Sequence, residues 1–107
     1  MPYLIRCLYR PGGAADRLPI RADHIRHMLA WLPQTVFGAA MLDAAGEQPA
    51  GMVVALSVAS QGEAQRFIDA EPYNAAGLFA SVEITPLVQM TPPHTRDLLE
   101  SELKKCE

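Results

Sequence analysis

The chain has 107 residues and a formal net charge of −3 at neutral pH, which is the size of one domain. Half of its residues are hydrophobic, a share that is sufficient for a packed core and argues against intrinsic disorder. The nine basic residues are scattered, which argues against nucleic acid as a partner. No stretch approaches the ~20 apolar residues of a membrane span, and the first residues lack the pattern of a secretory signal. We therefore expect a cytoplasmic protein with no membrane partner.

The two cysteines, Cys7 and Cys106, lie near opposite ends of the chain and have no zinc-site spacing. In a reducing compartment we expect a core thiol at Cys7 and a free thiol at Cys106, with no disulfide. The sequence also lacks the glycine-rich, P-loop, HExxH and GxSxG motifs, so it gives no support to nucleotide binding or standard hydrolase chemistry. We predict no metal and no cofactor.

The first predicted element is a strand over residues 3–9. It is largely apolar on both faces, which predicts an inner strand of a sheet. Proline and two glycines at positions 11–13 end this strand, and a loop is expected as far as Pro19.

A helix is predicted next, over residues 22–32, because apolar residues recur at helical spacing on one face and Pro33 ends the run. That face consists of Ile25, Met28, Leu29 and Leu32. A short strand over residues 36–42 follows. Gly38 within it predicts either a β-bulge or a place where another group approaches the backbone closely.

The strongest strand signal is the apolar run over residues 51–58, which predicts a central strand after a turn-rich connector at 43–49. Ser60 and Glu63 then form a capping-box pattern, in which Glu63 would reach back to the Ser60 amide. This second helix would bury Ala64, Phe67 and Ile68, and the last strand is expected over residues 79–88.

The C-terminal stretch predicts one more helix, with Thr91 as its N-cap and Pro92 in its first turn. Its apolar stripe is narrow and consists of Leu98, Leu99 and Leu103. Such a helix would either dock on a partner subunit or fray.

The predicted order β-α-β-β-α-β is that of a ferredoxin-like α+β fold, a four-stranded antiparallel sheet with both helices on one face. The other face of this sheet is apolar in the sequence, so a second copy of the chain is expected to cover it. We therefore predict a homodimer, built from a core domain over residues 1–88 with a helical extension over residues 89–107.

Two motifs in this chain resemble those of the YciI-like (YCII-related) family. They are Arg21-x-x-His24 and the stretch Ala70-Glu71-Pro72-Tyr73-x-x-Ala76-Gly77-Leu78-Phe79-x-x-Val82-x-Ile84-x-Pro86. The resemblance implies a dimeric α+β barrel with a pocket whose histidine and acid act as an acid–base pair, here His24 and Glu71. The family more often has aspartate at the position of Glu71. One relative is thought to eliminate chloride from a chlorinated hydroxyquinone, and related barrels include monooxygenases, isomerases and binding proteins.

The residue types fit this assignment, although each also has a plainer interpretation. Imidazole exchanges a proton near neutral pH, so His24 is either a general base or a histidine that hydrogen-bonds near a helix start. Glu71 precedes proline, which favours extended backbone, so it either aims into the pocket or is a solvated turn carboxylate. Tyr73 would bind substrate or only pack. Arg21 would grip an anion or form an exposed salt bridge.

Other polar residues are weaker candidates. Asp16 and Arg17 could reach the mouth of the pocket, whereas His27 and His94 are expected on the surface. Gly77 is expected to have a backbone conformation that other residues resist.

Together these observations predict a cofactor-independent lyase or isomerase that acts on a small organic, aromatic molecule. The alternatives are a dimer that binds a small metabolite without turnover, and a purely structural interaction domain.

Overall fold

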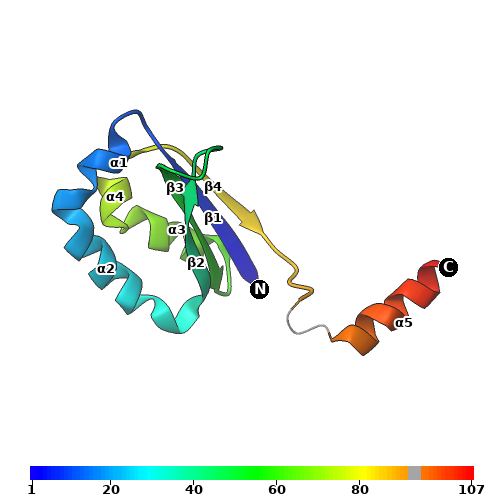
Figure 1. Ribbon diagram of the computed structural model, residues 1–107. Helices are drawn as coiled ribbons and strands as arrows, with labels where there is room; N and C mark the ends of the chain where they lie inside the picture. The colour runs from blue at the N-terminus through cyan, green and yellow to red at the C-terminus, as the bar shows by residue number, and fades with distance from the viewer. Residues whose placement is uncertain (92–94) are drawn as a thin grey trace.

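The computed structural model describes residues 1–91 and 95–107 (Figure 1). The strands are β1 (Pro2–Tyr9), β2 (Thr35–Leu42), β3 (Pro49–Ser57) and β4 (Phe79–Pro86), and the two principal helices of the core are α2 (Arg21–Ala30) and α3 (Gln61–Asp69). Shorter helical turns are α1 (Gly13–Asp16), η1 (Leu18–Ile20), η2 (Leu32–Gln34) and α4 (Pro72–Ala75), and the last helix is α5 (Arg96–Cys106).

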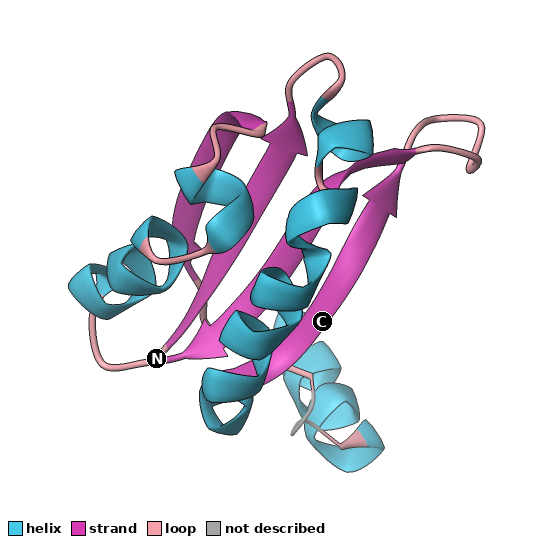
Figure 2. Cartoon of the chain, turned by 90° about the vertical axis from the view of Figure 1, so that its left-hand side faces the viewer, coloured by secondary structure: helices cyan, strands magenta, loops and turns pink. Residues whose placement is uncertain are grey.

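The four strands form one antiparallel sheet in the order β2-β3-β1-β4. Helices α2, α3 and α4 lie on one face of this sheet, whereas α5 lies apart from it (Figure 2). This is the ferredoxin-like α+β arrangement that the order of elements predicted. Within the described ranges, no helix has the length and apolar character needed to cross a membrane.

The core lies between the two central strands and α3. Ile5 and Cys7 of β1 and Leu56 of β3 are fully buried, because alternate residues of a strand point to the same face. Helix α3 contributes the three residues that the sequence predicted, Ala64, Phe67 and Ile68, all of which are also fully buried. Burial of each large side chain of this kind stabilises the fold by about 1.5–3 kcal/mol.

The start of α3 confirms the predicted N-cap. The side chain of Ser60 accepts a hydrogen bond from the Glu63 amide at 3.3 Å. The Glu63 carboxylate reaches back as expected, but it accepts from the amide of Ala59, at 3.2 Å, and not from that of Ser60. The cap therefore joins the helix to the residue that precedes its N-cap.

The apolar face predicted for α2 is not buried. Ile25, Leu29 and Leu32 are 39%, 61% and 61% exposed, and only Met28 packs against the core. The helix also ends at Ala30, before the predicted boundary. Gly38 is not a bulge, since it pairs with Val54 and the irregularities of β2 fall on either side of it. Because Gly38 has no side chain, α2 finds little to pack against at this point of β2.

The segment after β1 was predicted as a loop but contains α1 and η1, which lead directly into α2. Strand β4 ends at Pro86, and α5 has Thr95 as its N-cap in place of Thr91, with its side chain accepting from the Leu98 amide at 3.3 Å. The expectations for Pro92 and His94 fall outside the described residues. The leucines of α5 are about half exposed.

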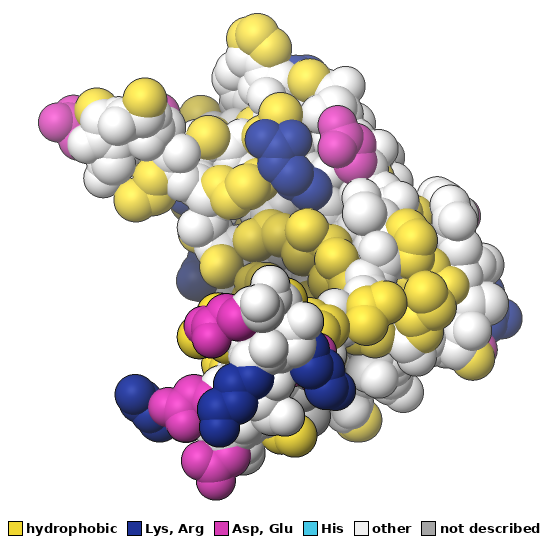
Figure 3. Space-filling model, turned by 90° about the vertical axis from the view of Figure 1, so that its right-hand side faces the viewer, with side chains coloured by type: hydrophobic (Ala, Val, Ile, Leu, Met, Phe, Trp, Pro, Cys, Tyr) yellow, Lys and Arg dark blue, Asp and Glu magenta, His cyan; other side chains and the backbone are white. Residues whose placement is uncertain are grey.

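The sheet face opposite the helices, here called the open face, is largely apolar (Figure 3). The strand register places one set of alternate residues on it, and Phe37 there is 47% exposed. The apolar members of this set are Leu4, Leu8, Phe37, Ala39, Met41, Val53 and Ala55, and the same register also places Arg6, Glu83 and Thr85 on this face.

Candidate active site

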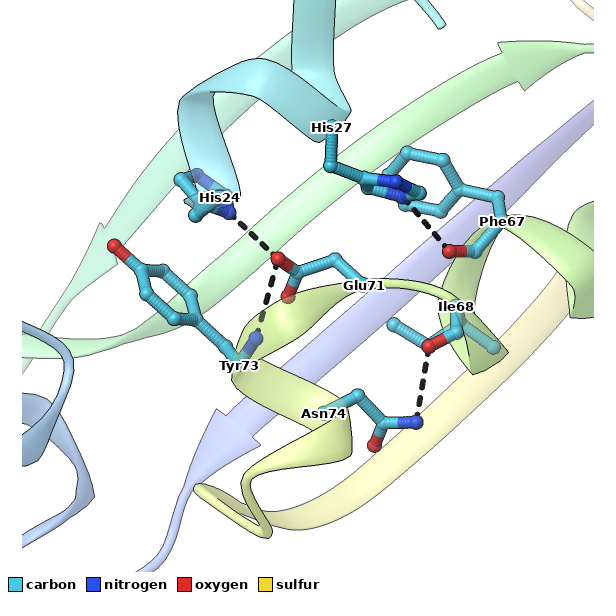
Figure 4. A network of polar contacts seen from close by, with 7 residues as sticks. All are labelled: His24, His27, Phe67, Ile68, Glu71, Tyr73 and Asn74. Atoms are coloured by element: carbon cyan, nitrogen blue, oxygen red, sulfur yellow. Dashed lines mark hydrogen bonds and ion pairs between the residues drawn. The ribbon is translucent and has the colours of Figure 1, made fainter. Parts of the chain in front are cut away.

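The structure brings His24 and Glu71 together, although 47 residues separate them in sequence (Figure 4). His24 lies in the first turn of α2, and Glu71 is the N-cap of α4. The distance from His24 Nδ1 to Glu71 Oε1 is 2.8 Å. The glutamate side chain is fully buried, whereas that of His24 is 19% exposed. The interpretation of Glu71 as a solvated turn carboxylate is therefore wrong.

The backbone around Glu71 explains how its longer side chain fits. Glu71 is extended, with φ −69° and ψ 121°, as the following proline requires. Its Oε1 atom accepts a hydrogen bond from the Tyr73 amide at 3.3 Å, so the side chain bends back over the first turn of α4. The Asn74 side chain anchors the same turn by donating to the carbonyl of Ile68 at 3.0 Å. The carboxylate is thus held in place by its own helix cap.

The hydrogen-bonding pattern selects one form of the histidine. An ionised carboxylate can only accept, so Nδ1 of His24 carries the proton and Nε2 of the neutral ring has a free lone pair. Within residues 1–91 and 95–107, His24 Nε2 makes no hydrogen bond. The ring also stacks on Tyr73, with centroids 4.1 Å apart and planes 9° from parallel. Its orientation is therefore fixed from two sides.

A cavity of about 410 Å³ lies beside this pair, between α2 and strands β2 and β3. His24 and Met28 line its helix side, and Gly38 lies on its sheet side. A side-chain carbon at Gly38 would meet only the Met28 methyl group, at 4.0 Å. Because Gly38 has no side chain, the space between α2 and β2 stays open. The sequence predicted either a bulge or a close contact at Gly38, and the structure shows neither.

Two tyrosines complete the wall. Burial raises the pKa of Tyr73 and that of Tyr9, and the charge of Arg17 partly opposes both shifts. Both hydroxyls therefore keep their protons at neutral pH and can donate hydrogen bonds into the cavity. Tyr9 was not among the residues predicted from the sequence. The available signal was its position as the last helix-facing residue of β1, next to the loop that leads to α2.

Arg17 and Arg21 both line the cavity. Arg21 is exposed but forms no salt bridge within the described residues, so its interpretation as half of an ion pair is wrong. Arg17, the weaker candidate from sequence, reaches the site. Asp16 does not, because it pairs with Arg10 at 3.0 Å outside the cavity.

The remaining reactive side chains have structural roles. Burial, with a smaller contribution from the charge of Glu71, raises the pKa of the Cys7 thiol to about 12, as expected for a core residue. His27 is half-buried and not on the surface, and its Nε2 donates to the carbonyl of Phe67 at 2.9 Å (Figure 4). Gly77 has φ +72°, which confirms its predicted left-handed conformation. No three His, Cys, Asp or Glu side chains of the described ranges are grouped to hold a metal ion.

Comparison with known proteins identifies the family of the chain. The model of the YCII-related domain matches residues 1–88. The chain belongs to the YCII-related family. None of the functionally curated proteins matches this YCII-related chain.

The solved structures with a similar chain include the following two. One is 5-chloro-2-hydroxyhydroquinone dehydrochlorinase from Burkholderia phenoliruptrix, in complex with 2,5-dihydroxybenzoquinone, with a TM-score of 0.77 and 24% identity over 83% of this chain and 95% of that one. The other is a protein of unknown function from Nitrosomonas europaea, with a TM-score of 0.44 and 21% identity over 88% of this chain and 94% of that one. At this identity the first similarity establishes the fold and not the activity.

Proposed function

We propose that this chain is a cofactor-independent acid–base enzyme, of the lyase or isomerase type, that acts on a small hydroxylated aromatic molecule. The observation that carries the proposal is the 2.8 Å contact between His24 Nδ1 and the fully buried carboxylate of Glu71. This contact leaves Nε2 as the basic atom, on a residue that lines a cavity of about 410 Å³.

In the proposed reaction Nε2 of His24 accepts the proton of a substrate hydroxyl. The electron pair of the broken O–H bond moves into the ring. In an isomerase reaction the proton returns from the imidazolium to a ring carbon. In a lyase reaction that carbon is the one that carries the leaving group: once it is protonated, a second hydroxyl loses its proton to Nε2, and the electron pair released forms a quinone carbonyl and expels the anionic group with its bonding pair. Glu71 keeps the imidazole in the reactive tautomer and stabilises the imidazolium ion. Because the carboxylate is buried, this attraction is screened less than in water.

The aromatic nature of the substrate has two supports. The cavity is lined by the rings of His24, Tyr73 and Tyr9, which can pack against a planar molecule while the tyrosine hydroxyls bind its oxygens. In addition, the fold relative from Burkholderia phenoliruptrix is named as a dehydrochlorinase of a chlorinated hydroxyhydroquinone. That compound is therefore a reasonable first substrate to test.

The test is anaerobic incubation with 5-chloro-2-hydroxyhydroquinone, with release of chloride as the measured product. We expect His24→Gln to lower the rate by about 10²–10⁴-fold, the usual contribution of a general base. Glu71→Gln should lower it by less, since the imidazole remains. His27→Gln is the matched control, because it removes the other histidine of α2, which contacts Phe67 outside the cavity.

A measurement on the unliganded protein tests the same geometry without a substrate. The nitrogen-15 chemical shifts of the His24 ring should show a proton on Nδ1 and none on Nε2, and Glu71→Gln should mix the two tautomers. A wild-type ring protonated on Nε2, or chloride release that His24→Gln does not change, would contradict the proposal.

The alternative function, binding of a small metabolite without turnover, has one observation in its favour. Arg17 and Arg21 line the cavity with no ion-pair partner in the described part of the chain, and holding an anion needs no proton transfer. Tight binding of 2,5-dihydroxybenzoquinone, together with no chloride release from the chlorinated compound, would favour this alternative.

We also propose that the chain is a homodimer in which the open faces of two sheets pack together. The apolar residues Leu4, Leu8, Phe37 and Val53 on that face support this proposal. Phe37→Glu should convert the dimer to a monomer in sedimentation analysis, and an unchanged mass would contradict it.

Residues 89–107 are proposed as an extension of the 1–88 domain, since α5 lies apart from the sheet (Figure 1). The unpaired thiols of Cys7 and Cys106 support the predicted cytoplasmic location.

A further inference from the structure

The charge of the cavity differs from that of the whole chain. The chain has a net charge of −3, yet Arg17 and Arg21 are the charged side chains that line the cavity, together with the titratable His24. No carboxylate is part of its described lining, because Glu71 is fully buried behind His24. The charge of Glu71 still acts on the cavity, since it contributes to the raised pKa of Tyr9 and of Tyr73, but two arginines oppose this one carboxylate, so the net charge around the cavity is positive and favours an anion.

The pairing of the arginines supports this reading. Of the five other arginines, four pair with a carboxylate and Arg6, on the open face, does not; the side chains of Arg17 and Arg21 likewise form no ion pair or hydrogen bond within residues 1–91 and 95–107. The paired arginines, with their partners in parentheses, are Arg10 (Asp16), Arg26 (Asp23), Arg66 (Glu63) and Arg96 (Glu100). The two guanidinium groups at the cavity are thus free to bind a ligand.

The two arginines are also placed beside the reacting group. Arg17 is the N-cap of η1, Arg21 and His24 lie in the first turn of α2, and all three side chains line the cavity. The positive charge of Arg17 acts on the hydroxyls of both Tyr9 and Tyr73, and that of Arg21 acts on Tyr73. Tyr73 in turn stacks on His24. An anionic group held by the arginines would lie next to the ring that His24 deprotonates.

We propose that the ligand of this cavity is a planar aromatic anion, and that Arg17 and Arg21 bind its negatively charged oxygen atoms. This inference rests on the proposed function, because it assigns the charge of the molecule whose proton His24 would accept. The oxygens belong either to a carboxylate on the ring or to an ionised ring hydroxyl; a guanidinium group matches both, through paired N–H donors.

Calorimetry with two molecules of equal shape measures the preference. 2,5-Dihydroxybenzoate and 2,5-dihydroxybenzamide differ in charge but hardly in size, and both keep the ring hydroxyls. We expect the acid to bind at least about tenfold more tightly than the amide, as charge-assisted hydrogen bonds are stronger than neutral ones. 2,5-Dihydroxybenzoquinone, whose charge is on ring oxygens, distinguishes the two sources: if it binds more tightly than the acid, the anion is a ring oxygen.

Variants assign the preference to the two arginines. Arg17→Gln combined with Arg21→Gln should remove the difference between acid and amide, whereas Arg26→Gln on the same helix should preserve it, since Arg26 pairs with Asp23 outside the cavity. Equal binding of acid and amide by the wild type, binding of neither, or a preference that survives in the double variant would overturn the inference.

His24→Gln separates this inference from the proposed function. The variant should keep the preference for the acid although it loses turnover. A wild-type protein that prefers the acid but shows no His24-dependent reaction would end the catalytic proposal and leave the charge assignment in place. A His24-dependent reaction without any preference for the anion would keep the catalytic proposal and end the charge assignment.

Discussion

Helices α2 and α3 lie on the same face of one sheet but have opposite roles. Helix α3 fully buries Ala64, Phe67 and Ile68 and is capped by Ser60. Helix α2 has no fully buried residue and no side-chain cap at its start. The cavity lies on the sheet side of α2, which is the side that the helix fails to fill.

This difference shows how a small domain divides stability from function. The free energy of folding comes mainly from the side of the sheet that α3 covers, where apolar surface leaves water. The helix that carries His24, Arg21 and the wall of the cavity is held by fewer contacts, among them the polar ones from His24 to Glu71 and from His27 to Phe67. Substitutions on α3 should therefore change stability, and substitutions at the α2 side of the cavity should change binding with little effect on stability.

The largest expected effect on stability comes from a substitution in α3. Phe67→Ala removes a fully buried ring and should lower the free energy of unfolding by about 3–5 kcal/mol. Leu29→Ala on α2 is the matched control; because Leu29 is 61% exposed, its substitution should cost less than about 1 kcal/mol. Urea unfolding measures both. Equal losses would show that α2 is packed as firmly as α3.

The pH dependence of stability should reveal the same buried core. The folded Cys7 thiol keeps its proton up to a pKa of about 12, whereas the unfolded thiol loses it above about 9.0. Between these values the unfolded state binds fewer protons, so the free energy of unfolding should fall as pH rises, by about 1.4 kcal/mol per pH unit. Below that window Cys7 adds no pH dependence.

Comparison of Cys7→Ala with the wild type isolates this contribution, since other groups titrate equally in both. The free energy of unfolding in urea should fall less steeply with pH for Cys7→Ala than for the wild type. Cys106→Ala should follow the wild type, because Cys106 is exposed. Parallel curves for Cys7→Ala and the wild type would contradict the assigned burial of the thiol.

A substitution on the α2 side should change binding and leave stability nearly intact. Gly38→Val adds methyl groups to the cavity from β2, where only the Met28 methyl lies within 4.0 Å. We expect the affinity for 2,5-dihydroxybenzoate to fall about tenfold or more, with a change in unfolding free energy below about 1 kcal/mol. Leu42→Val, at the exposed end of the same strand, is the control. A destabilised Gly38→Val variant with normal affinity would place the cavity elsewhere.

The smallest effect concerns the helix starts. Ser60→Ala should cost about 1 kcal/mol of stability, because the cap of α3 is lost. Ser57→Ala, an exposed serine at the end of β3, is the control and should have little effect. Helix α2 has no such cap to lose at Ile20. Thermal unfolding should therefore distinguish the two serines, and an equal response would mean that the Ser60 cap contributes nothing.

The sequence predicted the fold well wherever one local signal determined the result. Strand periodicity located β1 and β3, and the capping box located the start of α3. The C-terminal helix was placed too early, because Thr91 and Thr95 carry the same local signal and the sequence offers no way to choose between them. The helical turns between β1 and α2 were missed because proline and glycine in that stretch are typical of loops.

The site was predictable in part. The family motifs indicated His24 and Glu71, and the structure places them 2.8 Å apart. Tyr9 was missed, and Arg17 was ranked too low, because neither lies in a motif. Both face the cavity only because β1 ends there and the chain turns back over it. His27 was expected on the surface, since its contact with Phe67 joins residues 40 positions apart.

By itself, the sequence determined the order of strands and helices, the residues that α3 buries and the pair of motifs that name the family. These follow from periodicity, capping and turn residues, which act over a few positions along the chain. Only the tertiary structure decided that α2 would leave its apolar face unburied, that Gly38 and Met28 would border a cavity, and that two unpaired arginines would face it. Those outcomes depend on the distance between a helix and a sheet, which is set by the packing of all elements together and by no single segment.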